Sequence, residues 1–346
     1  MKGLVVDNKG QLSIQEMPMP KIDDYKALVK MESCGVCNGT DMKLIHRNFK
    51  NFDTYPAVLG HEGVGRVVEK GKRVTSFEIG DSVLLPFLEE KEGEYYPGWG
   101  AFSEYAIVGD AKAMIQDGKG PGTPYFSESY FAQQVVPKSI DSVDAAMIIT
   151  FREVLSATKR FGMRENKSLV VFGAGPVGLC FIKFAKLLGM GPIICFDVVD
   201  GKVKDALNMG ADYAFNSTQH DVLSTVKDIL PELADFAVDA VGMNQLINQA
   251  MHLIHYNGKI CCYGISPKLN MNLDWSPAPY NWSLDFVQWP SKKEESEAHA
   301  QILSWIQLGA LVPNEFISHV IPFADIFSAF EMVESRAATK KIIIKF

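Results

Sequence analysis

Between residues 144 and 263, short apolar runs alternate with longer segments in which apolar residues recur at helical spacing. Such apolar runs are typical of strands buried on both faces, and the longer segments are typical of amphipathic helices. The alternation predicts a parallel sheet covered by helices on both faces. The expected strands are residues 168–172, 192–196, 211–215, 236–240 and 259–263, and the expected helices are residues 144–162, 173–190, 203–209, 221–230 and 244–255.

The first hundred residues have a different pattern, in which short strands are interrupted by glycine and proline. Residues 64–69, 81–85 and 102–108 are expected strands of a β-rich domain with Greek-key or barrel character. We expect residues 89–100 to form a surface loop, and residues 109–129 to form a long insertion without regular structure. Near the end of the chain we expect helices at residues 294–308 and 323–335 and a strand at residues 341–346.

Composition narrows the class of protein. The 346 residues are too many for one ordinary core and suit two domains, and 47% apolar with 22% charged residues is the balance of a soluble globular protein. The net charge of −7 disfavours nucleic acid and anionic membranes as partners, and no apolar run reaches the ~18 residues of a membrane span. The amino terminus lacks the apolar stretch of a signal peptide, and six cysteines are too few for a disulfide scaffold, so we expect a cytoplasmic protein.

A glycine-rich turn follows the first expected strand of the parallel sheet. The sequence from Gly173 through Ala174, Gly175, Pro176 and Val177 to Gly178 is a GxGxxG motif between a strand and a helix, where it is typical of a dinucleotide site. The first glycine permits the tight turn, the second lets the backbone approach a pyrophosphate, and the third lets helix and strand pack closely. The helix N-terminus attracts the phosphates.

Further residues around this turn favour NAD as the cofactor. Asp197 ends the next strand, where a carboxylate accepts hydrogen bonds from the ribose hydroxyls and repels the 2′-phosphate of NADP. Ligands of such sheets bind at the carboxyl ends of the strands, so Val241 with Gly242, and Gly264 with Ile265, are expected to flank the cofactor. A flavin or S-adenosylmethionine site could use similar geometry, and the residues outside this domain decide against both.

Two stretches upstream carry residues that bind metals. Cys37 precedes Asp41 in one stretch, and His61 and Glu62 are adjacent in the other. A thiolate, an imidazole and a carboxylate form the ligand set of a catalytic zinc with one open position, and Asp41 could hold His61 through its second ring nitrogen. Separately, Cys34 and Cys37 could be buried thiols or a redox pair, and the His61 dipeptide could be a polar turn.

Together and in this order, the stretches resemble the zinc-containing medium-chain dehydrogenases, a family that includes alcohol, sorbitol and threonine dehydrogenases. The resemblance covers nearly the whole chain and includes residues 80–83, residues 100–105 and the basic closing strand. It implies an α/β protein with a β-rich, GroES-like catalytic domain and a Rossmann domain with a doubly wound parallel sheet. The catalytic domain would comprise residues 1–148 and 290–346, and the Rossmann domain residues 149–289.

The resemblance also implies roles for individual residues. Cys37 and His61 would bind zinc, and Glu62 would be a carboxylate within reach of the metal. Thr40 would pass the proton of the substrate hydroxyl toward solvent. In the family one residue separates the ligand cysteine from the Ser/Thr-Asp pair, whereas Asn38 and Gly39 both intervene here.

The third zinc ligand departs from the family pattern. Relatives carry Cys, Asp or Glu where the linking helix begins, and the matching residues here, Ile149 and Thr150, are not strong zinc ligands. Two candidates remain: Glu153, which lies one helical turn beyond Ile149 on the same face, or Glu62. The structural-zinc lobe with its four cysteines is absent, and Lys43 replaces the histidine of the outer proton relay.

These observations predict an enzyme that transfers a hydride between a secondary alcohol and NAD with the help of zinc. By analogy with its relatives, the substrate is expected to be a polyol or a sugar-derived alcohol, and the protein is expected to be a dimer or tetramer. Two alternatives stay open: a zinc-free reductase that acts on enones or quinones with NAD(P)H, and a non-catalytic NAD-binding member.

Overall fold

The computed structural model describes all residues, 1–346, and divides the chain into two compact units. The first unit comprises residues Met1–Arg152, Ser291–Leu303 and Val312–Phe346, and the second comprises Glu153–Pro290 and Ser304–Leu311. The short segment 304–311 thus groups with the second unit, and the domain boundaries expected after residues 148 and 289 stay a prediction.

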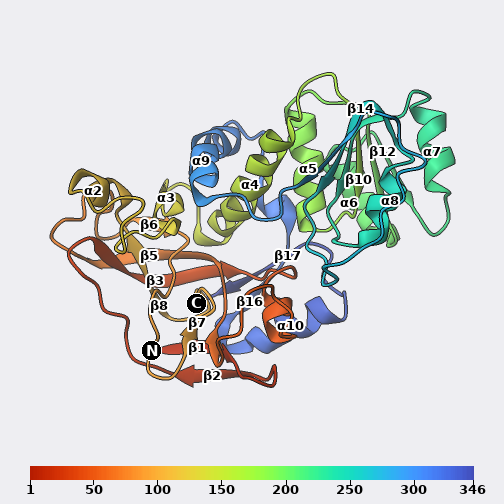
Figure 1. Ribbon diagram of the computed structural model, residues 1–346. Coiled ribbons are helices and arrows are strands. Elements are labelled where there is room, and N and C mark those ends of the chain that lie inside the picture. Colours follow the sequence, from red (N-terminus) through yellow and green to blue (C-terminus); the bar gives the residue numbers. More distant parts are fainter. The chain divides into compact units, whose positions relative to one another are not determined.

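The second unit is built on a six-stranded sheet in which every neighbouring pair is parallel (Figure 1). In spatial order the strands are β12 (Tyr213–Asn216), β11 (Ile193–Asp197), β10 (Leu169–Phe172), β13 (Ala234–Asp239), β14 (Ile254–Cys262) and β15 (Ser283–Phe286). β10 consists entirely of buried apolar residues, and β11 and β13 are buried and apolar apart from their aspartates, as the apolar runs in the sequence predict.

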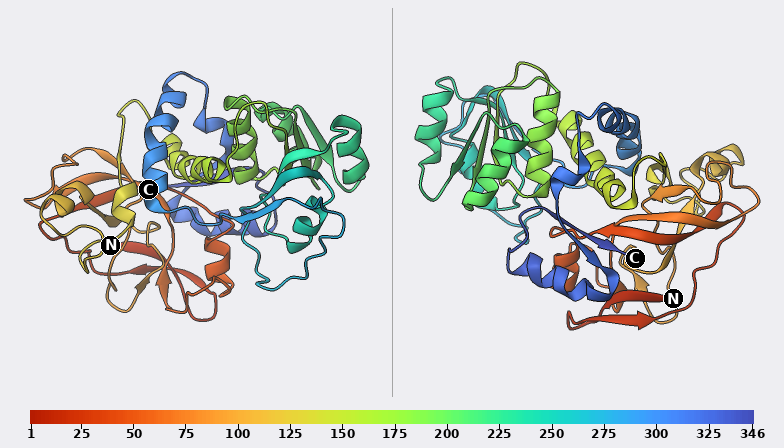
Figure 2. Two further views of the ribbon diagram at one scale, coloured as in Figure 1. Left: turned by 45° about the horizontal axis from the view of Figure 1, so that its top comes forward. Right: turned by 180° about the vertical axis from the view of Figure 1, so that it is seen from behind.

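Helices connect these strands and cover the sheet on both faces, as the two views of Figure 2 show. They are α5 (Pro176–Leu187), α6 (Asp200–Met209), α7 (Val222–Ile229) and α8 (Asn244–Ala250). Apolar residues of α7 and α8 pack with one face of β10, β11, β13 and β14 in a single buried core. From β10 the chain continues through β11 to β12 on one side of β10, and then crosses back to β13 on its other side. The strand order therefore changes direction between β10 and β13, and such sheets bind their ligands at this switch point.

The first unit contains two sheets that are mostly antiparallel. One has the order β2-β1-β4-β7, and the other has the order β16-β17-β3-β5-β6-β9 with β8 paired to β3. The strands are β1 (Lys2–Val6), β2 (Leu12–Glu16), β3 (Lys26–Gly35), β4 (Ala57–Val58), β5 (Glu62–Lys70), β6 (Ser82–Leu84), β7 (Tyr96–Pro97), β8 (Tyr105–Gly109), β9 (Val135–Val136), β16 (Ile317–Pro322) and β17 (Lys341–Lys345).

The helices outside the parallel sheet are α1 (Asp41–Ile45), α2 (Ala111–Gln116), α3 (Ser129–Ala132), α4 (Ser142–Phe161), α9 (Lys292–Gln307) and α10 (Ile326–Glu334). Of these helices, α4 and α9 are long, and the others have at most nine residues. Short 3₁₀ turns lie at Pro313–Phe316 and Phe323–Asp325. No helix combines the length and the apolar character needed to cross a bilayer.

Three expectations about local structure are wrong. The insertion at residues 109–129 contains the helix α2, because Asp110 caps it through Ala113 N and also accepts hydrogen bonds from Thr75 and Ser76. The helix expected at residues 244–255 ends at Ala250, because the chain enters β14 early through an irregular pairing with β13. The surface loop expected at residues 89–100 contains the short strand β7.

Candidate metal centre and dinucleotide site

The pairing of two strands brings the expected metal ligands together. β3 and β5 pair antiparallel with Gly35 opposite Glu62, so the end of β3 and the beginning of β5 lie side by side. Cys37 follows β3 by two residues, and His61 directly precedes β5. A Cβ at Gly35 would lie 2.3 Å from Glu62 Oε2, so a larger residue there would displace the carboxylate.

Cys37, His61 and Glu62 offer one ligand atom each, and all three atoms lie within 4.8 Å of one another. His61 Nε2 is 3.9 Å from Glu62 Oε1. A tetrahedral zinc holds its nitrogen, oxygen and sulfur ligands about 3.3–3.8 Å apart, so small side-chain movements close the group around one ion. His61 and Glu62 are buried and Cys37 is half-buried, so the donor set fits a zinc ion with a position open to a substrate.

A tight turn behind the group orients His61. Cys37 N donates to Asp41 Oδ2 at 2.9 Å, and Asp41 N donates to the Cys37 carbonyl at 3.0 Å, so the extra residue in this stretch is accommodated in a closed loop before α1. Asp41 Oδ1 lies 3.5 Å from His61 Nδ1, the arrangement of a carboxylate that orients a metal-binding histidine. Thr40, at the start of α1, is buried beside them.

Neighbouring charges and hydrogen bonds shift the pKa values of His61 and Glu62 toward their charged forms. Burial alone would lower the pKa of His61, but hydrogen bonds to Asp41 and Cys37 outweigh it and raise that pKa well above its usual value. Burial alone would raise the pKa of Glu62, but the nearby charges of Lys341 and His61 outweigh it and lower that pKa. The metal-free group therefore favours ionised side chains, and a metal that binds His61 must displace its proton, because a ligating histidine is neutral.

Sequence reasoning missed Lys341. Its Nζ donates to both carboxylate oxygens of Glu62 at 2.7 Å, and both side chains are almost completely buried. β17 pairs with β3 so that Ile343 lies opposite Gly35, and this register places Lys341 near Glu62. The signal was the lysine that begins the closing strand directly before three isoleucines.

The alternative third ligand, Glu153, is not a member of the group formed by Cys37, His61 and Glu62. It lies on α4, just beyond Arg152, and its role as a ligand stays a prediction. Ile149 and Thr150, which match the family's third-ligand position, are both buried.

Aromatic side chains border the metal group. The Trp99 ring lies 5.7 Å from the His61 ring between centroids, at an angle of 54°. Phe49 contacts Trp99 edge-on at 5.6 Å, and Phe52 stacks on it at 6.4 Å. All three rings are partly exposed, so they form an apolar wall beside the metal ligands, which the sequence pattern did not single out.

The glycine-rich turn joins β10 to α5. Gly173 has φ +93°, a conformation that L side chains rarely adopt, and a Cβ on Gly178 would lie 1.8 Å from the Gly173 carbonyl oxygen. A Cβ on Gly175 would meet nothing within 4 Å, so its side faces open space. The helix starts at Pro176, with its free N–H groups directed at this space.

Asp197 stands beside the turn at the end of β11. Its Oδ2 accepts from Ala174 N at 2.7 Å and its Oδ1 accepts from Val199 N at 3.0 Å. The carboxylate is thereby fixed next to the glycine-rich turn and keeps lone pairs for further donors.

The two later loops expected to flank the cofactor touch each other at the carboxyl ends of β13 and β14. A Cβ on Gly242, which has φ +86°, would lie 2.7 Å from the backbone of Ile265, and a Cβ on Gly264 would lie 2.1 Å from Gly242 N. Val241 is 47% exposed at the same edge. The four residues thus line the edge of the sheet that carries the glycine-rich turn.

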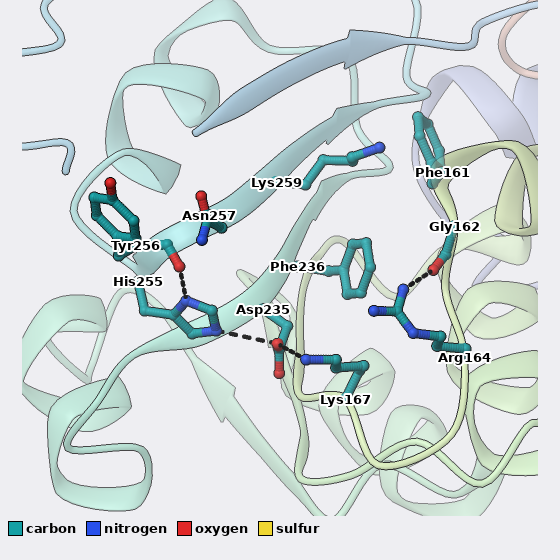
Figure 3. Close-up of a pocket in the computed structure, with 10 residues that line it drawn as sticks. All are labelled: Phe161, Gly162, Arg164, Lys167, Asp235, Phe236, His255, Tyr256, Asn257 and Lys259. Carbon is teal, nitrogen blue, oxygen red and sulfur yellow. Dashed lines mark hydrogen bonds and ion pairs between the residues drawn. The ribbon is translucent and has the colours of Figure 1, made fainter. Parts of the chain in front are cut away.

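A cavity of about 360 Å³ lies at the opposite edge of this sheet, where the strands begin (Figure 3). Asp235, at the start of β13, accepts hydrogen bonds there from Lys167 Nζ at 2.8 Å, His255 Nε2 at 3.0 Å and Ser168 N at 2.9 Å. Burial opposes ionisation, but these bonds lower the pKa of Asp235 to about 2. The cluster joins the starts of three strands and is remote from the glycine-rich turn.

Comparisons with known proteins agree with this geometry. Residues 23–116 match the model of the alcohol dehydrogenase GroES-like domain, and residues 176–286 match the model of the zinc-binding dehydrogenases. A sorbitol dehydrogenase of Bombyx mori is 26% identical over 352 residues, covering 98% of this chain and 97% of the relative. An alcohol dehydrogenase of Geobacillus stearothermophilus is 31% identical over 239 residues, covering 66% of this chain and 67% of the relative.

Among solved structures, 2R,3R-butanediol dehydrogenase from Bacillus subtilis superposes with a TM-score of 0.80 at 20% identity, covering all of this chain and 99% of the other. This likeness shows a common fold. The chain belongs to the zinc-type medium-chain dehydrogenases and is an enzyme of alcohol or polyol oxidoreduction. The expected combination of a GroES-like unit with a Rossmann unit is confirmed.

Proposed function

We propose that this enzyme oxidises a secondary alcohol, either a polyol or a sugar-derived alcohol, with zinc and NAD. The convergence of Cys37, His61 and Glu62 carries the proposal. The sorbitol and butanediol dehydrogenases among the similar proteins support a polyol as substrate. The reaction removes a hydride and a proton from the alcohol carbon and hydroxyl, and the hydride reduces NAD.

Cys37, His61 and Glu62 would hold the zinc. When bound, zinc supplies Lewis acidity that lowers the pKa of the substrate hydroxyl. Asp41 orients the His61 ring, and Thr40 at the neighbouring helix start takes the hydroxyl proton toward solvent. Glu62 rather than Glu153 completes the ligand set in this proposal, because only the former lies within the group.

The turn from Gly173 to Gly178, with Pro176 and Val177 in the first turn of α5, would bind the pyrophosphate of NAD. Asp197 would accept hydrogen bonds from the adenosine ribose hydroxyls. Its negative charge would repel the 2′-phosphate of NADP, so we propose a preference for NAD.

The test combines metal content with activity on a panel of secondary alcohols and polyols. We expect about one zinc per chain, NAD reduction with at least one member of the panel, and loss of both after treatment with a chelator. Cys37→Ser should lose zinc and activity, whereas Cys34→Ala, which removes a buried thiol three positions away, should keep the zinc. Full activity of the chelated enzyme, or a full zinc content in Cys37→Ser, would contradict the proposal.

The enzyme is also proposed to be a homo-oligomer in the cytoplasm. β15 is the last strand of its sheet and carries the exposed Phe286, and Tyr280, three residues before the strand, is also exposed. An uncovered sheet edge with exposed aromatic residues favours pairing with a second copy. The molar mass in solution, measured by light scattering, tests this: a monomer for both the wild type and Phe286→Asp would contradict it. The six free cysteines suit a reducing compartment.

A further inference from the structure

The carboxylate of Glu62 faces two kinds of partner. Its Oε1 belongs to the metal-ligand group, 3.9 Å from His61 Nε2. The same Oε1 and its neighbour Oε2 each accept a hydrogen bond from Lys341 Nζ at 2.7 Å. The side chains of Glu62 and Lys341 are 2% and 4% exposed, so water does little to solvate either charge.

We propose that Lys341 is the internal counter-ion of Glu62 and limits how tightly this site holds its metal. The inference rests on the proposed function in one respect only, that the group is a metal site. In the metal-free chain the ammonium neutralises the buried carboxylate, so the site is stable without a cation. A metal that binds Glu62 must share the carboxylate with the ammonium or displace it.

The distances require this competition. A zinc–carboxylate bond is about 2.1 Å long, so a zinc on Glu62 Oε1 lies no more than about 5 Å from Lys341 Nζ. Two positive charges at that separation in a buried site repel each other strongly, even with the effective dielectric constant of about 20 that suits protein sites. Lys341 therefore opposes every cation that Glu62 attracts.

The charge balance of the group points in the same direction. The Cys37 thiolate and the Glu62 carboxylate neutralise a zinc dication, and Thr150 adds no negative charge at the family's third-ligand position. Lys341 adds a further positive charge, and only the buried Asp41 carboxylate, which faces the other ring nitrogen of His61, offsets it. We conclude that Lys341 weakens the hold of this site on its metal.

Removal of the Lys341 ammonium raises the affinity for zinc through two separate effects. It abolishes the repulsion in the loaded state, and it leaves Glu62 without its counter-ion in the metal-free state. Both changes favour binding. Lys341→Met should therefore lower the dissociation constant for zinc by roughly tenfold or more, as two like charges about 5 Å apart imply. A purely structural lysine predicts the opposite, because its loss would disorder Glu62 and weaken the site.

The experiment measures zinc affinity by competition with a chromophoric chelator on the full-length protein, and cobalt binding by its thiolate charge-transfer band. The controls are Lys341→Arg, which keeps the charge, and Lys345→Met, which removes an exposed lysine from the same strand. Both should stay within about threefold of the wild type. If Lys341→Met folds only with zinc, chelation should unfold it while the wild type stays folded, as expected when zinc replaces the lost counter-ion.

The outcomes separate the inference from the proposed function. Unchanged or weaker zinc binding by Lys341→Met, and by Lys341→Gln as a second variant, overturns the inference. If the wild type itself binds neither zinc nor cobalt, the proposed metal function fails. Tighter binding in both variants, with unchanged Lys345→Met, supports the inference independently of any turnover.

Discussion

A methyl group added at Gly175 should act very differently from one added at Gly178. At Gly178 the new Cβ would lie 1.8 Å from the Gly173 carbonyl oxygen, far inside the 3.0 Å that non-bonded heavy atoms keep from a Cβ. The start of α5 must then move by roughly 1 Å or more, within a close-packed interior. At Gly175 the Cβ would meet nothing within 4 Å, and φ −74° with ψ −177° is accessible to alanine.

The magnitudes follow from this contrast. Forcing an extra carbon into a packed interior costs about 1–3 kcal/mol, and Gly178→Ala should lie at or above the upper end because the clash is with backbone. Gly175→Ala should leave the free energy of unfolding within about 1 kcal/mol of the wild type. The same methyl group fills the space through which the backbone approaches a pyrophosphate, so NADH affinity should fall about tenfold, or about 1.4 kcal/mol.

Urea unfolding gives the stabilities, and quenching of protein fluorescence by NADH gives the affinities. Gly175→Ala should separate the two quantities, with normal stability and weak binding, whereas Gly178→Ala should lose stability first. If Gly175→Ala bound NADH like the wild type, or were destabilised as strongly as Gly178→Ala, the assignment of the turn to a pyrophosphate would be wrong.

Other perturbations test the charged and crowded parts of the structure. Asp235→Asn should reduce the unfolding free energy by about 2 kcal/mol near neutral pH, because the folded pKa of Asp235, about 2, lies below the ordinary 3.8. In urea titrations, this loss of stability relative to the wild type should be constant above pH ~4 and should shrink toward pH ~2. A loss that does not change with pH would contradict the prediction. Burial, and after it the charge of Arg152, lowers the pKa of His299 from 6.5 to about 4. The unfolding free energy should therefore fall by up to about 3 kcal/mol as the pH falls from ~6.5 to ~4. His299→Gln should flatten this dependence of stability on pH. Gly35→Ala should displace Glu62 and reduce the zinc content. Gly39→Ala should retain zinc, because its Cβ would only make an ordinary contact of 3.7 Å with Cys37 Sγ. Equal zinc contents in the two variants would refute the packing argument.

The parallel sheet could be predicted from sequence because its information is local. Strands buried on both faces must be apolar throughout, and helices over them must be amphipathic, so the pattern from residue 144 to residue 263 follows from burial alone. The sixth strand, β15, was not predicted, because it lies at the edge of the sheet, where Phe286 is exposed and prolines flank the strand. Edge strands carry fewer buried residues and so leave a weaker pattern.

The helix α2 was not predicted from the sequence for a different reason. It is only six residues long, and a helix of that length is not stable alone. Its stability comes from Asp110, which accepts hydrogen bonds from Ala113 at the helix start and from Thr75 and Ser76 more than thirty residues away in sequence. A sequence window around residue 110 contains only one of these partners, and the surrounding glycines favour the loop interpretation.

The metal group shows how far motif reasoning extends and where register must take over. His61 and Glu62 are adjacent, so one short motif identifies both, and Cys37 is identified by the sequence around it. Lys341 is 279 residues from Glu62, and no local pattern connects them. The connection arises because β17 and β5 are both neighbours of β3, with Ile343 and Glu62 each opposite Gly35. Once that double register is fixed, a lysine near the start of the closing strand must lie near the carboxylate at the start of β5. A charge in an otherwise buried strand is costly unless it is paired, so such a lysine indicates a buried acid on a neighbouring strand even before the acid is identified.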